Sequence, residues 1–297
     1  MNMHTGRNDD LRRSRTRRKV RLLPDASDES SGFRIHDNFE GFSQVDDVFC
    51  RSQYDPEIKS SKSERFYDMY RKPLADWRGT DGYQQHDYAF RNATWHVADI
   101  FAELREVDDR RDGFLDPLSL LKDGPEERIE FGSVEETTRI VKQAAKTVGA
   151  DLVGVADTDS RWSYTELFSM QAKGPKPNNI DDGLGHVIVI GQSMDNELLD
   201  TAPSALSGAA TGMGYSQDAL VLLTLSQFIQ NLGYRAVPSM NDSALAIPYA
   251  VQAGLGEYAK HGLVITPEFG SSVRFGKIFT DMPLEADKPI RFGVREM

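Results

Sequence analysis

Cysteine is almost absent from this chain. Cys50 is the only one among 297 residues. A single cysteine excludes an internal disulfide, and such scarcity is typical of proteins from a reducing compartment. It also excludes, within this chain, the set of thiolates that a structural zinc site or an iron–sulfur cluster needs. We therefore expect no metal site built from the chain's own side chains.

Long hydrophobic runs are missing as well. No apolar stretch reaches the roughly 20 residues that a membrane-spanning helix needs. The paired arginines near the N-terminus are followed by LLPDASDESSG instead of the apolar stretch of an export signal. We expect a cytoplasmic protein without a membrane partner.

Motifs for metal binding and acid–base catalysis are also lacking. The six histidines show neither H-x-x-x-H nor H-E-x-x-H spacing. The 46 acidic residues are too scattered to indicate a pair of catalytic carboxylates. Polar chemistry therefore has to be sought in other residue types.

Charge is unevenly distributed along the chain. The net charge is −11, yet residues 1–21 carry eight basic side chains and two acidic ones. A basic arm can bind nucleic acid, which leaves a DNA-associated protein as an alternative. No aromatic residues or basic helical face accompany this arm. We therefore interpret residues 1–35 as a disordered basic leader and expect no nucleic-acid partner.

The rest of the chain divides into two parts. Residues 36–130 form an irregular, aromatic-rich accessory region that we expect to wrap onto the main body, and residues 131–297 form an α/β domain. Ser133 and Glu136 make a capping box that opens a helix, and Gly149 ends it. Alternating apolar segments predict an α/β or α+β layered sheet with flanking helices. The expected strands are 152–156, 186–191, 234–237, 262–270 and 273–282, with helices at 216–233 and 244–256.

The segment GAATGMGYS (208–216) is rich in glycine. It predicts a loop that lets a ligand approach the N-terminus of the helix capped by Ser216, with Asp218 in the first turn. It lacks the endings of a phosphate loop and of a dinucleotide fingerprint. Tyr215 in this loop is either a packed aromatic residue or a general acid, since a phenol beside a cation gives up its proton more easily.

Two cations follow on an expected strand. Strand alternation places Arg274 and Lys277 on opposite faces unless Gly276 forms a bulge. Their simplest interpretation is a pair of solvated charges that protect an edge strand. Asn241, in PSMND, has the pattern of a turn or cap residue.

A longer signature changes these interpretations. The segments GYS, FIQNLGYRAVPSMND and PYAVQAGLGEYAKHGLVITPEFGSSVRFGKIFTDMPLEADKPIRFGV resemble the corrinoid- and iron–sulfur-dependent reductive dehalogenases. MYRKPLADWRGTDGYQQHDYAFRNATWHVAD resembles the N-terminal part of their cytoplasmic, non-exported branch. The resemblance covers roughly residues 65–297. The epoxyqueuosine reductases, which share the fold and cofactor, are similar to a lesser degree.

The resemblance implies a nitroreductase-like domain that binds cobalamin without a protein ligand to cobalt. The lack of a D-x-H-x-x-G motif agrees with that. It implies that Tyr215 is the proton donor, that Arg274 or Lys277 is its cationic partner, and that Asn241 lies in the substrate pocket. The residues it assigns to cofactor binding are Gly214, Ser216, Gly254, Gly256, Thr266, Pro267, Glu268 and Phe269.

The chain departs from the family in one respect. Family members continue into a ferredoxin-type cysteine array that holds two [4Fe-4S] clusters, whereas this sequence has only Cys50. We expect the corrinoid-binding portion of an enzyme that cleaves the carbon–halogen bond of an organohalide, and the resemblance to that branch implies an aromatic one. It should be inactive without a separately supplied iron–sulfur domain or protein, so it would be a fragment or one half of a split enzyme. The alternatives are a non-enzymatic corrinoid-binding protein and an epoxyqueuosine reductase-like reductase.

Overall fold

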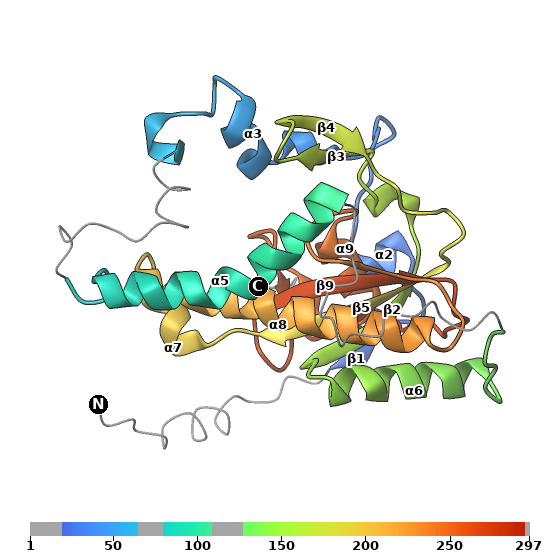
Figure 1. Cartoon of the computed structure of the whole chain (residues 1–297). Coiled ribbons are helices and arrows are strands. Elements are labelled where there is room, and N and C mark those ends of the chain that lie inside the picture. The colour runs from blue at the N-terminus through green and yellow to red at the C-terminus, as the bar shows by residue number, and fades with distance from the viewer. Residues whose placement is uncertain (1–19, 65–79, 109–126, 295–297) are drawn as a thin grey trace, which may run out of the picture.

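A four-stranded antiparallel sheet forms the centre of the computed structural model, which describes residues 20–64, 80–108 and 127–294. Its strand order is β2 (Leu152–Asp157), β5 (His186–Ser193), β9 (Val273–Thr280) and β6 (Ala236–Ser239). Helices cover both faces of this sheet (Figure 1). The mixed helix-and-sheet class expected from the sequence is confirmed.

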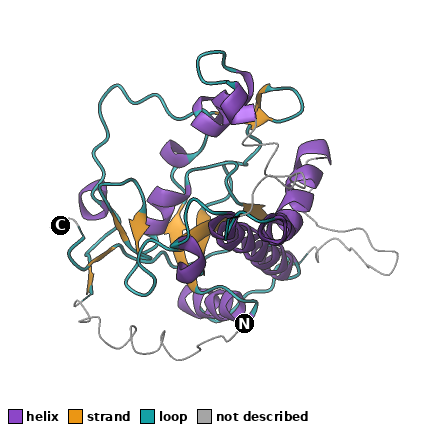
Figure 2. Ribbon diagram, turned by 90° about the vertical axis from the view of Figure 1, so that its left-hand side faces the viewer, coloured by secondary structure: helices purple, strands orange, loops and turns teal. Residues whose placement is uncertain are grey.

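The two central strands are buried on both faces. Val187 and Val189 of β5 belong to one core cluster, and Ile188 and Ile190 belong to the other. Because neighbouring residues of a strand point to opposite faces, an unbroken apolar run is what a doubly covered strand requires. Helices α6 (Val134–Thr147) and α8 (Ala205–Gln230) pack on the isoleucine face, and α9 (Ala246–Gln252) packs on the other. Figure 2 looks along the long helices.

The register of β9 is continuous. It pairs with β5 residue for residue, from Ser193 opposite Val273 to His186 opposite Thr280. Gly276 therefore makes no bulge, and strand alternation places Arg274 and Lys277 on opposite faces of the sheet. Lys277 is fully buried and the Arg274 side chain is 9% exposed, so the interpretation of both as solvated edge charges is wrong.

The glycine-rich segment is helical, which corrects the expectation of a loop at 208–216. Helix α8 begins after Ser204, whose hydroxyl accepts a hydrogen bond from the backbone N–H of Leu206. A Cβ atom added at Gly208 would lie 2.7 Å from Arg91 Cδ, and one added at Gly212 would lie 2.3 Å from Trp95 Cδ1. The glycines therefore let helix α5 (Gln85–Asp108) pack closely against α8, which the local pattern does not reveal.

Several other sequence expectations hold with small shifts in position. The Ser133 hydroxyl accepts a hydrogen bond from Glu136 N, and the helix is followed by Gly149 at a φ of +112°. The strand expected at 234–237 is displaced to 236–239, and the segment 262–270 contributes only β8 (Val264–Ile265), which pairs with β7 (Glu257–Tyr258). The remaining elements are α3 (Val48–Tyr54), α7 (Asn196–Leu199), the hairpin β3 (Glu166–Ser169) and β4 (Gly174–Pro177), and short 3-10 turns at Gln44–Asp46 and Ser160–Trp162.

The expected leader is ordered where the structure describes it. Strand β1 (Arg21–Leu22) pairs with β10 (Ile290–Arg291), and α2 (Asp28–Ser31) is tied down by the Asp28–Arg161 ion pair at 2.6 Å. Disorder as far as residue 35 is therefore wrong, because long-range contacts hold residues 20–35 on the sheet domain. The rest of the leader, residues 1–19, lies outside the described residues, as do 65–79, 109–126 and 295–297.

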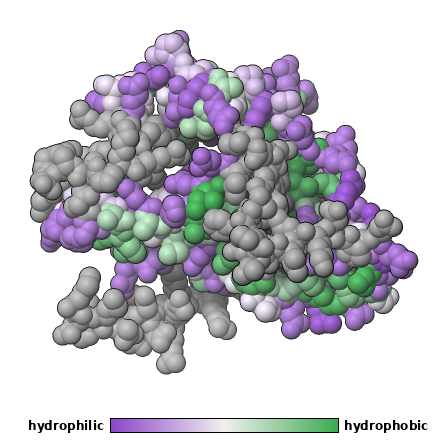
Figure 3. Space-filling view, in the orientation of Figure 1, coloured by the Kyte–Doolittle hydropathy of each residue, from purple (hydrophilic) through white to green (hydrophobic). Residues whose placement is uncertain are grey.

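The surface has a mixed character. Among the coloured residues in Figure 3, hydrophilic ones predominate, and hydrophobic residues show as separate patches. Within the described ranges, no helix is long and apolar enough to cross a membrane.

Candidate active site

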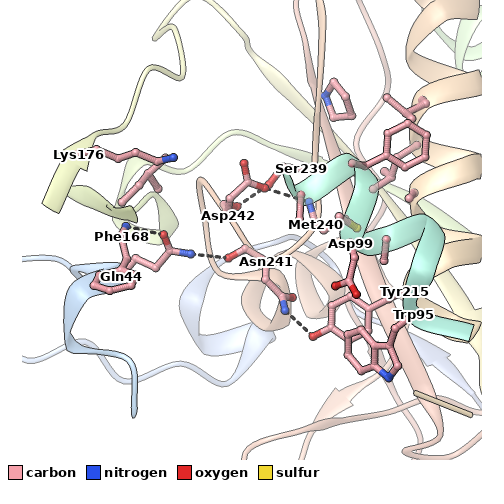
Figure 4. A pocket seen from close by; sticks show the side chains of 18 residues that line it. Gln44, Trp95, Asp99, Phe168, Lys176, Tyr215, Ser239, Met240, Asn241 and Asp242 are labelled. Atoms are coloured by element: carbon pink, nitrogen blue, oxygen red, sulfur yellow. Dashed lines mark hydrogen bonds between the residues drawn. The ribbon is translucent and has the colours of Figure 1, made fainter. Parts of the chain in front are cut away.

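A largely apolar pocket of about 320 Å³ lies beside the sheet. Its walls come from α5, the β3–β4 hairpin, the middle of α8 and the loop that follows β6 (Figure 4). The apolar lining includes Trp95, Phe101, Leu167, Phe168, Leu222 and Met240. Such a lining suits a small apolar ligand, and polar residues from several walls, among them Gln44, Asp99, Lys176, Tyr215 and Asn241, would determine its orientation.

Tyr215 is one of those polar groups. It projects from α8 and is half-buried, with its ring 4.6 Å from that of Trp95 between centroids. Its hydroxyl oxygen accepts a 2.6 Å hydrogen bond from Asn241 Nδ2, so the phenolic hydrogen is not used in this contact (Figure 4). The phenol is therefore oriented by one partner and keeps a proton to donate.

Arg274 completes the group from β9. Its guanidinium carbon lies 3.2 Å from the centre of the Tyr215 ring, a close cation–π contact. Its Nη2 donates a 3.1 Å hydrogen bond to Asn241 Oδ1. The structure thus brings together three residues that the sequence resemblance singled out, from α8, the loop after β6 and β9. We call Tyr215, Asn241 and Arg274 the Tyr–Asn–Arg cluster.

Lys277 supports the same loop from a different position. It is fully buried, and its Nζ donates a 2.5 Å hydrogen bond to the backbone oxygen of Met240, next to Asn241. Of the two cations proposed as partners of Tyr215, Arg274 is the one stacked on its ring. This geometry favours a role for Lys277 in holding the loop.

Asp218 is a neighbour of Arg274, and the sequence pattern predicts it in the first turn of a helix. The structure places it in the middle of α8, fully buried, with Oδ2 3.1 Å from Arg274 Nε. Burial raises the pKa of Asp218 to about 6, although the positive charges of Arg274 and Lys277 oppose that rise. Its spacing of three residues from Tyr215 is the one signal that could have placed both on the same helix face.

Three of the predicted cofactor-binding residues are engaged in contacts within the protein. The Ser216 hydroxyl donates to Thr94 O at 2.7 Å and accepts from Ala98 N at 3.3 Å, which ties α8 to α5. A Cβ atom at Gly254 would lie 2.5 Å from the Lys288 backbone oxygen, and one at Gly256 would lie 2.3 Å from that of Ile265. Close approach of the protein's own backbone is sufficient to explain both glycines.

The other predicted cofactor-binding residues differ in exposure, and Thr266 and Gly214 are buried. Thr266 closes a turn with Gly270 through paired backbone hydrogen bonds of 2.8 and 3.1 Å. Within that turn Pro267 and Glu268 are exposed, whereas Phe269 is half-buried against the core. Gly214 is buried on α8 one residue before Tyr215, where an added Cβ would be 3.2 Å from Met194 Cγ. Of the predicted cofactor positions, Pro267 and Glu268 are therefore the exposed ones.

Metal ligation has no support in the described part of the chain. No group of three or more histidine, cysteine, aspartate or glutamate side chains there could hold a metal ion. Burial raises the pKa of Cys50 to about 12, with a smaller contribution from the charge of Asp47, so its thiol stays protonated at neutral pH.

Comparisons with known sequences agree with the signature. Residues 183–284 match the family described as reductive dehalogenase subunit. The tetrachloroethene reductive dehalogenase of Sulfurospirillum multivorans is 40% identical over 186 residues, which are 54% of this chain and 37% of that protein. Its counterpart from Dehalobacter restrictus is 38% identical over 201 residues, which are 56% and 36% of the two chains. The chain therefore spans little more than a third of these relatives' length.

More distant similarity is also present. The epoxyqueuosine reductase of Salmonella typhimurium is 28% identical over 182 residues, 52% of this chain and 47% of that protein. Among solved structures, one titled "Reductive dehalogenase structure suggests a mechanism for B12-dependent dehalogenation" superposes with a TM-score of 0.65. It is 17% identical and covers 87% of this chain and 33% of its own, which establishes a shared fold. The sequence signature is thus confirmed, and the chain is related to the reductive dehalogenases.

Proposed function

We propose that this chain is the corrinoid-binding, substrate-protonating part of a reductive dehalogenase. The observation that carries the proposal is the Tyr–Asn–Arg cluster at one end of an apolar pocket. Tyr215 there has a hydroxyl hydrogen to donate, a fixed orientation and an adjacent cation. Replacement of a halogen by hydrogen requires a proton at carbon, and a phenol held in this way can supply it.

The residues of the cluster have separate roles in that proton transfer. Tyr215 donates its proton and becomes a phenolate, while the Asn241 N–H remains hydrogen-bonded to the same oxygen and stabilises the new charge. Arg274 lies against the ring, over which part of the negative charge is delocalised.

The residues around the site fit a bound corrinoid in part. The turn from Thr266 to Phe269 would contact it through Pro267 and Glu268, because these two residues are exposed, whereas Gly214 and Thr266 are buried. Ser216, Gly254 and Gly256 already serve contacts within the protein. A corrinoid, when bound, supplies the redox chemistry that breaks the carbon–halogen bond.

Electrons would have to come from another source. With Cys50 as its only cysteine, the sequence cannot supply the four thiolates of a [4Fe-4S] cluster. We therefore propose that turnover needs an iron–sulfur donor outside these 297 residues or a chemical reductant in its place.

The pocket suits a small, planar, apolar halide. Trp95, Phe101 and Phe168 provide aromatic surface in a volume of about 320 Å³. An aromatic halide is the substrate class expected from the sequence. A small chlorinated alkene is the second candidate, because relatives with up to 40% identity are named for tetrachloroethene.

Corrinoid binding and turnover together test this proposal. The purified chain would be titrated with cobalamin under reducing conditions, and halide release from tetrachloroethene and from a halogenated phenol measured with titanium(III) citrate as reductant. We expect release above the background of free cobalamin. Tyr215→Phe should lower that excess at least about 100-fold, the usual contribution of a general acid, with unchanged cobalamin affinity.

Tyr234→Phe is the matched control. The Tyr234 hydroxyl bonds to Ile129 O and is not among the pocket-lining residues, so the same atom is removed without touching the cluster. Equal turnover by wild type and Tyr215→Phe would refute the donor role. Failure to bind cobalamin would refute the proposal as a whole. Binding without any excess release would instead indicate a non-enzymatic corrinoid-binding protein.

A further inference from the structure

A buried carboxylate lies directly behind the Tyr–Asn–Arg cluster. Asp218 is on α8, about one turn after Tyr215, and it faces β9 at Gly276. A Cβ atom added at Gly276 would lie 2.5 Å from Asp218 Oδ1, so only glycine at this place in the strand leaves room for the carboxylate. The strand and the helix together form a space fitted to this side chain.

The carboxylate is oriented toward Arg274. Asp218 Oδ2 lies 3.1 Å from Arg274 Nε, while Nη2 of the same guanidinium bonds to Asn241 and its carbon stacks on the Tyr215 ring. Arg274 is therefore held by an anion behind it, an amide beside it and an aromatic face in front. Among the described residues, neither oxygen of Asp218 accepts a hydrogen bond, so this ion pair is its principal compensation.

A role confined to packing does not explain this residue. An ionised carboxylate without hydrogen bonds is destabilising in a protein interior, and the buried positions that follow it directly on α8 are apolar: Ala219, Val221 and Leu222. A leucine or alanine could fill such a position without that destabilisation. Burial also raises the pKa of Asp218 to about 6, while the positive charges of Arg274 and Lys277 favour its ionised form.

We infer that Asp218 is a positioning residue, which holds the Arg274 guanidinium against the Tyr215 ring and so fixes the cation beside the proton donor. The inference rests on the proposed function for its catalytic meaning. The positioning itself is a property of the folded chain, and it can be measured without turnover.

The test is nuclear magnetic resonance of the full chain labelled at arginine side-chain nitrogen and tyrosine ring carbon. Signals of Arg274 and Tyr215 would be assigned with Arg274→Lys and Tyr215→Phe. In Asp218→Asn we expect the Arg274 Nε–H to exchange with water at least about tenfold faster, because the ion pair no longer holds the guanidinium in its buried position. We also expect the Tyr215 ring signals to shift, because the guanidinium no longer lies over the ring.

Asp281→Asn provides the matched control. Asp281 also pairs with an arginine Nε, that of Arg235 at 3.0 Å; its side chain is 9% exposed, whereas that of Asp218 is fully buried, and it does not line the pocket. This variant should alter the Arg235 signal and leave Arg274 and Tyr215 unchanged. It separates loss of a local anchor from a general loosening of the fold.

Two results would overturn the inference. One is a folded Asp218→Asn protein in which the Arg274 and Tyr215 signals stay at their wild-type positions and rates. If that variant does not fold, Gly276→Ala takes its place, since the added methyl group displaces the carboxylate while retaining its charge. Unchanged Arg274 and Tyr215 signals in Gly276→Ala would then be the refuting result.

The catalytic consequence is measured separately. In the cobalamin and titanium(III) assay, Asp218→Asn should lower kcat about tenfold and leave KM and cobalamin affinity unchanged, because the cation acts on the proton transfer. Unchanged kcat together with altered resonance signals would limit Asp218 to a structural role. Wild-type turnover by Tyr215→Phe would refute the proposed function without affecting the resonance result.

Discussion

Asp218 makes a quantitative prediction about stability and pH. Its ordinary pKa is 3.8, and burial raises the folded-state value to about 6. The unfolded chain therefore releases this proton as the pH rises past 3.8, whereas the folded protein keeps it to about pH 6. Asp218 favours the folded state most below pH 3.8, and that contribution is lost as the pH rises between the two values.

The magnitude follows from the difference between the two pKa values. Each pKa unit corresponds to about 1.4 kcal/mol, so the contribution of Asp218 to the free energy of unfolding changes by about 3 kcal/mol between acid and pH 8. In Asp218→Asn the side chain is neutral at every pH. We expect the variant's stability relative to wild type to improve by about 2 kcal/mol or more between pH 4 and pH 8.

Urea unfolding followed by circular dichroism at each pH from 4 to 8 measures this difference. Subtracting wild type from variant cancels the other titrating groups, provided that the dependence of the free energy on urea stays constant. Asp181→Asn is a control with a flat expectation. The backbone N–H of Gly183 and the Arg235 side chain hold the Asp181 pKa below its usual value of 3.8, so its contribution to stability changes mainly below pH 4 and the difference between this variant and wild type should stay nearly constant from pH 5 to pH 8.

The reasoning would be refuted by a stability difference between Asp218→Asn and wild type that is flat from pH 4 to pH 8. A difference that becomes less favourable to the variant as the pH rises would refute it as well. Either result would mean that Arg274 and Lys277 compensate the ionised carboxylate fully. Ionised Asp218 would then not lower the free energy of unfolding.

Two other changes test the surroundings of the site. Gly212→Ala in α8 should destabilise the fold by about 1–3 kcal/mol and shift Trp95 fluorescence, because the methyl group would lie 2.3 Å from Trp95 Cδ1. Gly214→Ala in the same helix is its control: there the methyl group meets the flexible Met194 side chain at 3.2 Å, and thermal unfolding should show little loss or a small gain. Cys50, with its pKa raised to about 12, should react with a thiol-specific disulfide reagent at pH 8 at least about 100-fold more slowly than in the urea-unfolded chain, and equal rates would contradict its burial.

The sequence was sufficient to predict elements whose signals are local. The capping box at Ser133 and the apolar runs of β2, β5 and β9 correspond to observed elements because caps and burial act on neighbouring residues. Helix α8 begins eleven residues before the predicted helix 216–233. Its glycines make room for α5, which lies more than 100 residues earlier in the chain, and a local pattern cannot show this contact. A glycine that opens a loop and one that admits another helix look alike in sequence.

The candidate site shows the same division. The resemblance supplied Tyr215, Asn241, Arg274 and Lys277, but strand alternation alone could not decide which cation faces α8. Only the packing of α8 on β9 assigns Arg274 to the Tyr215 ring and Lys277 to the Met240 backbone. Asp218 could not be found by local pattern, since an acidic residue near an expected helix start has an ordinary explanation as a favourable dipole contact.

Of the two buried charged residues near β9, Lys277 and Asp218, only Asp218 indicates a functional role. Lys277 has a 2.5 Å hydrogen bond to a backbone oxygen, which is sufficient reason for a buried lysine that holds a loop. Asp218 has no hydrogen bond of its own among the described residues, and it faces a cation that also touches the donor phenol. A buried carboxylate that destabilises the fold when ionised is better explained by a need for its charge at a functional site than by a need to fill space in the core. For this reason we expect Asp218→Asn to gain stability at neutral pH and to lose kcat together. A gain in stability without a loss of kcat would mean that the buried charge of Asp218 does not serve catalysis.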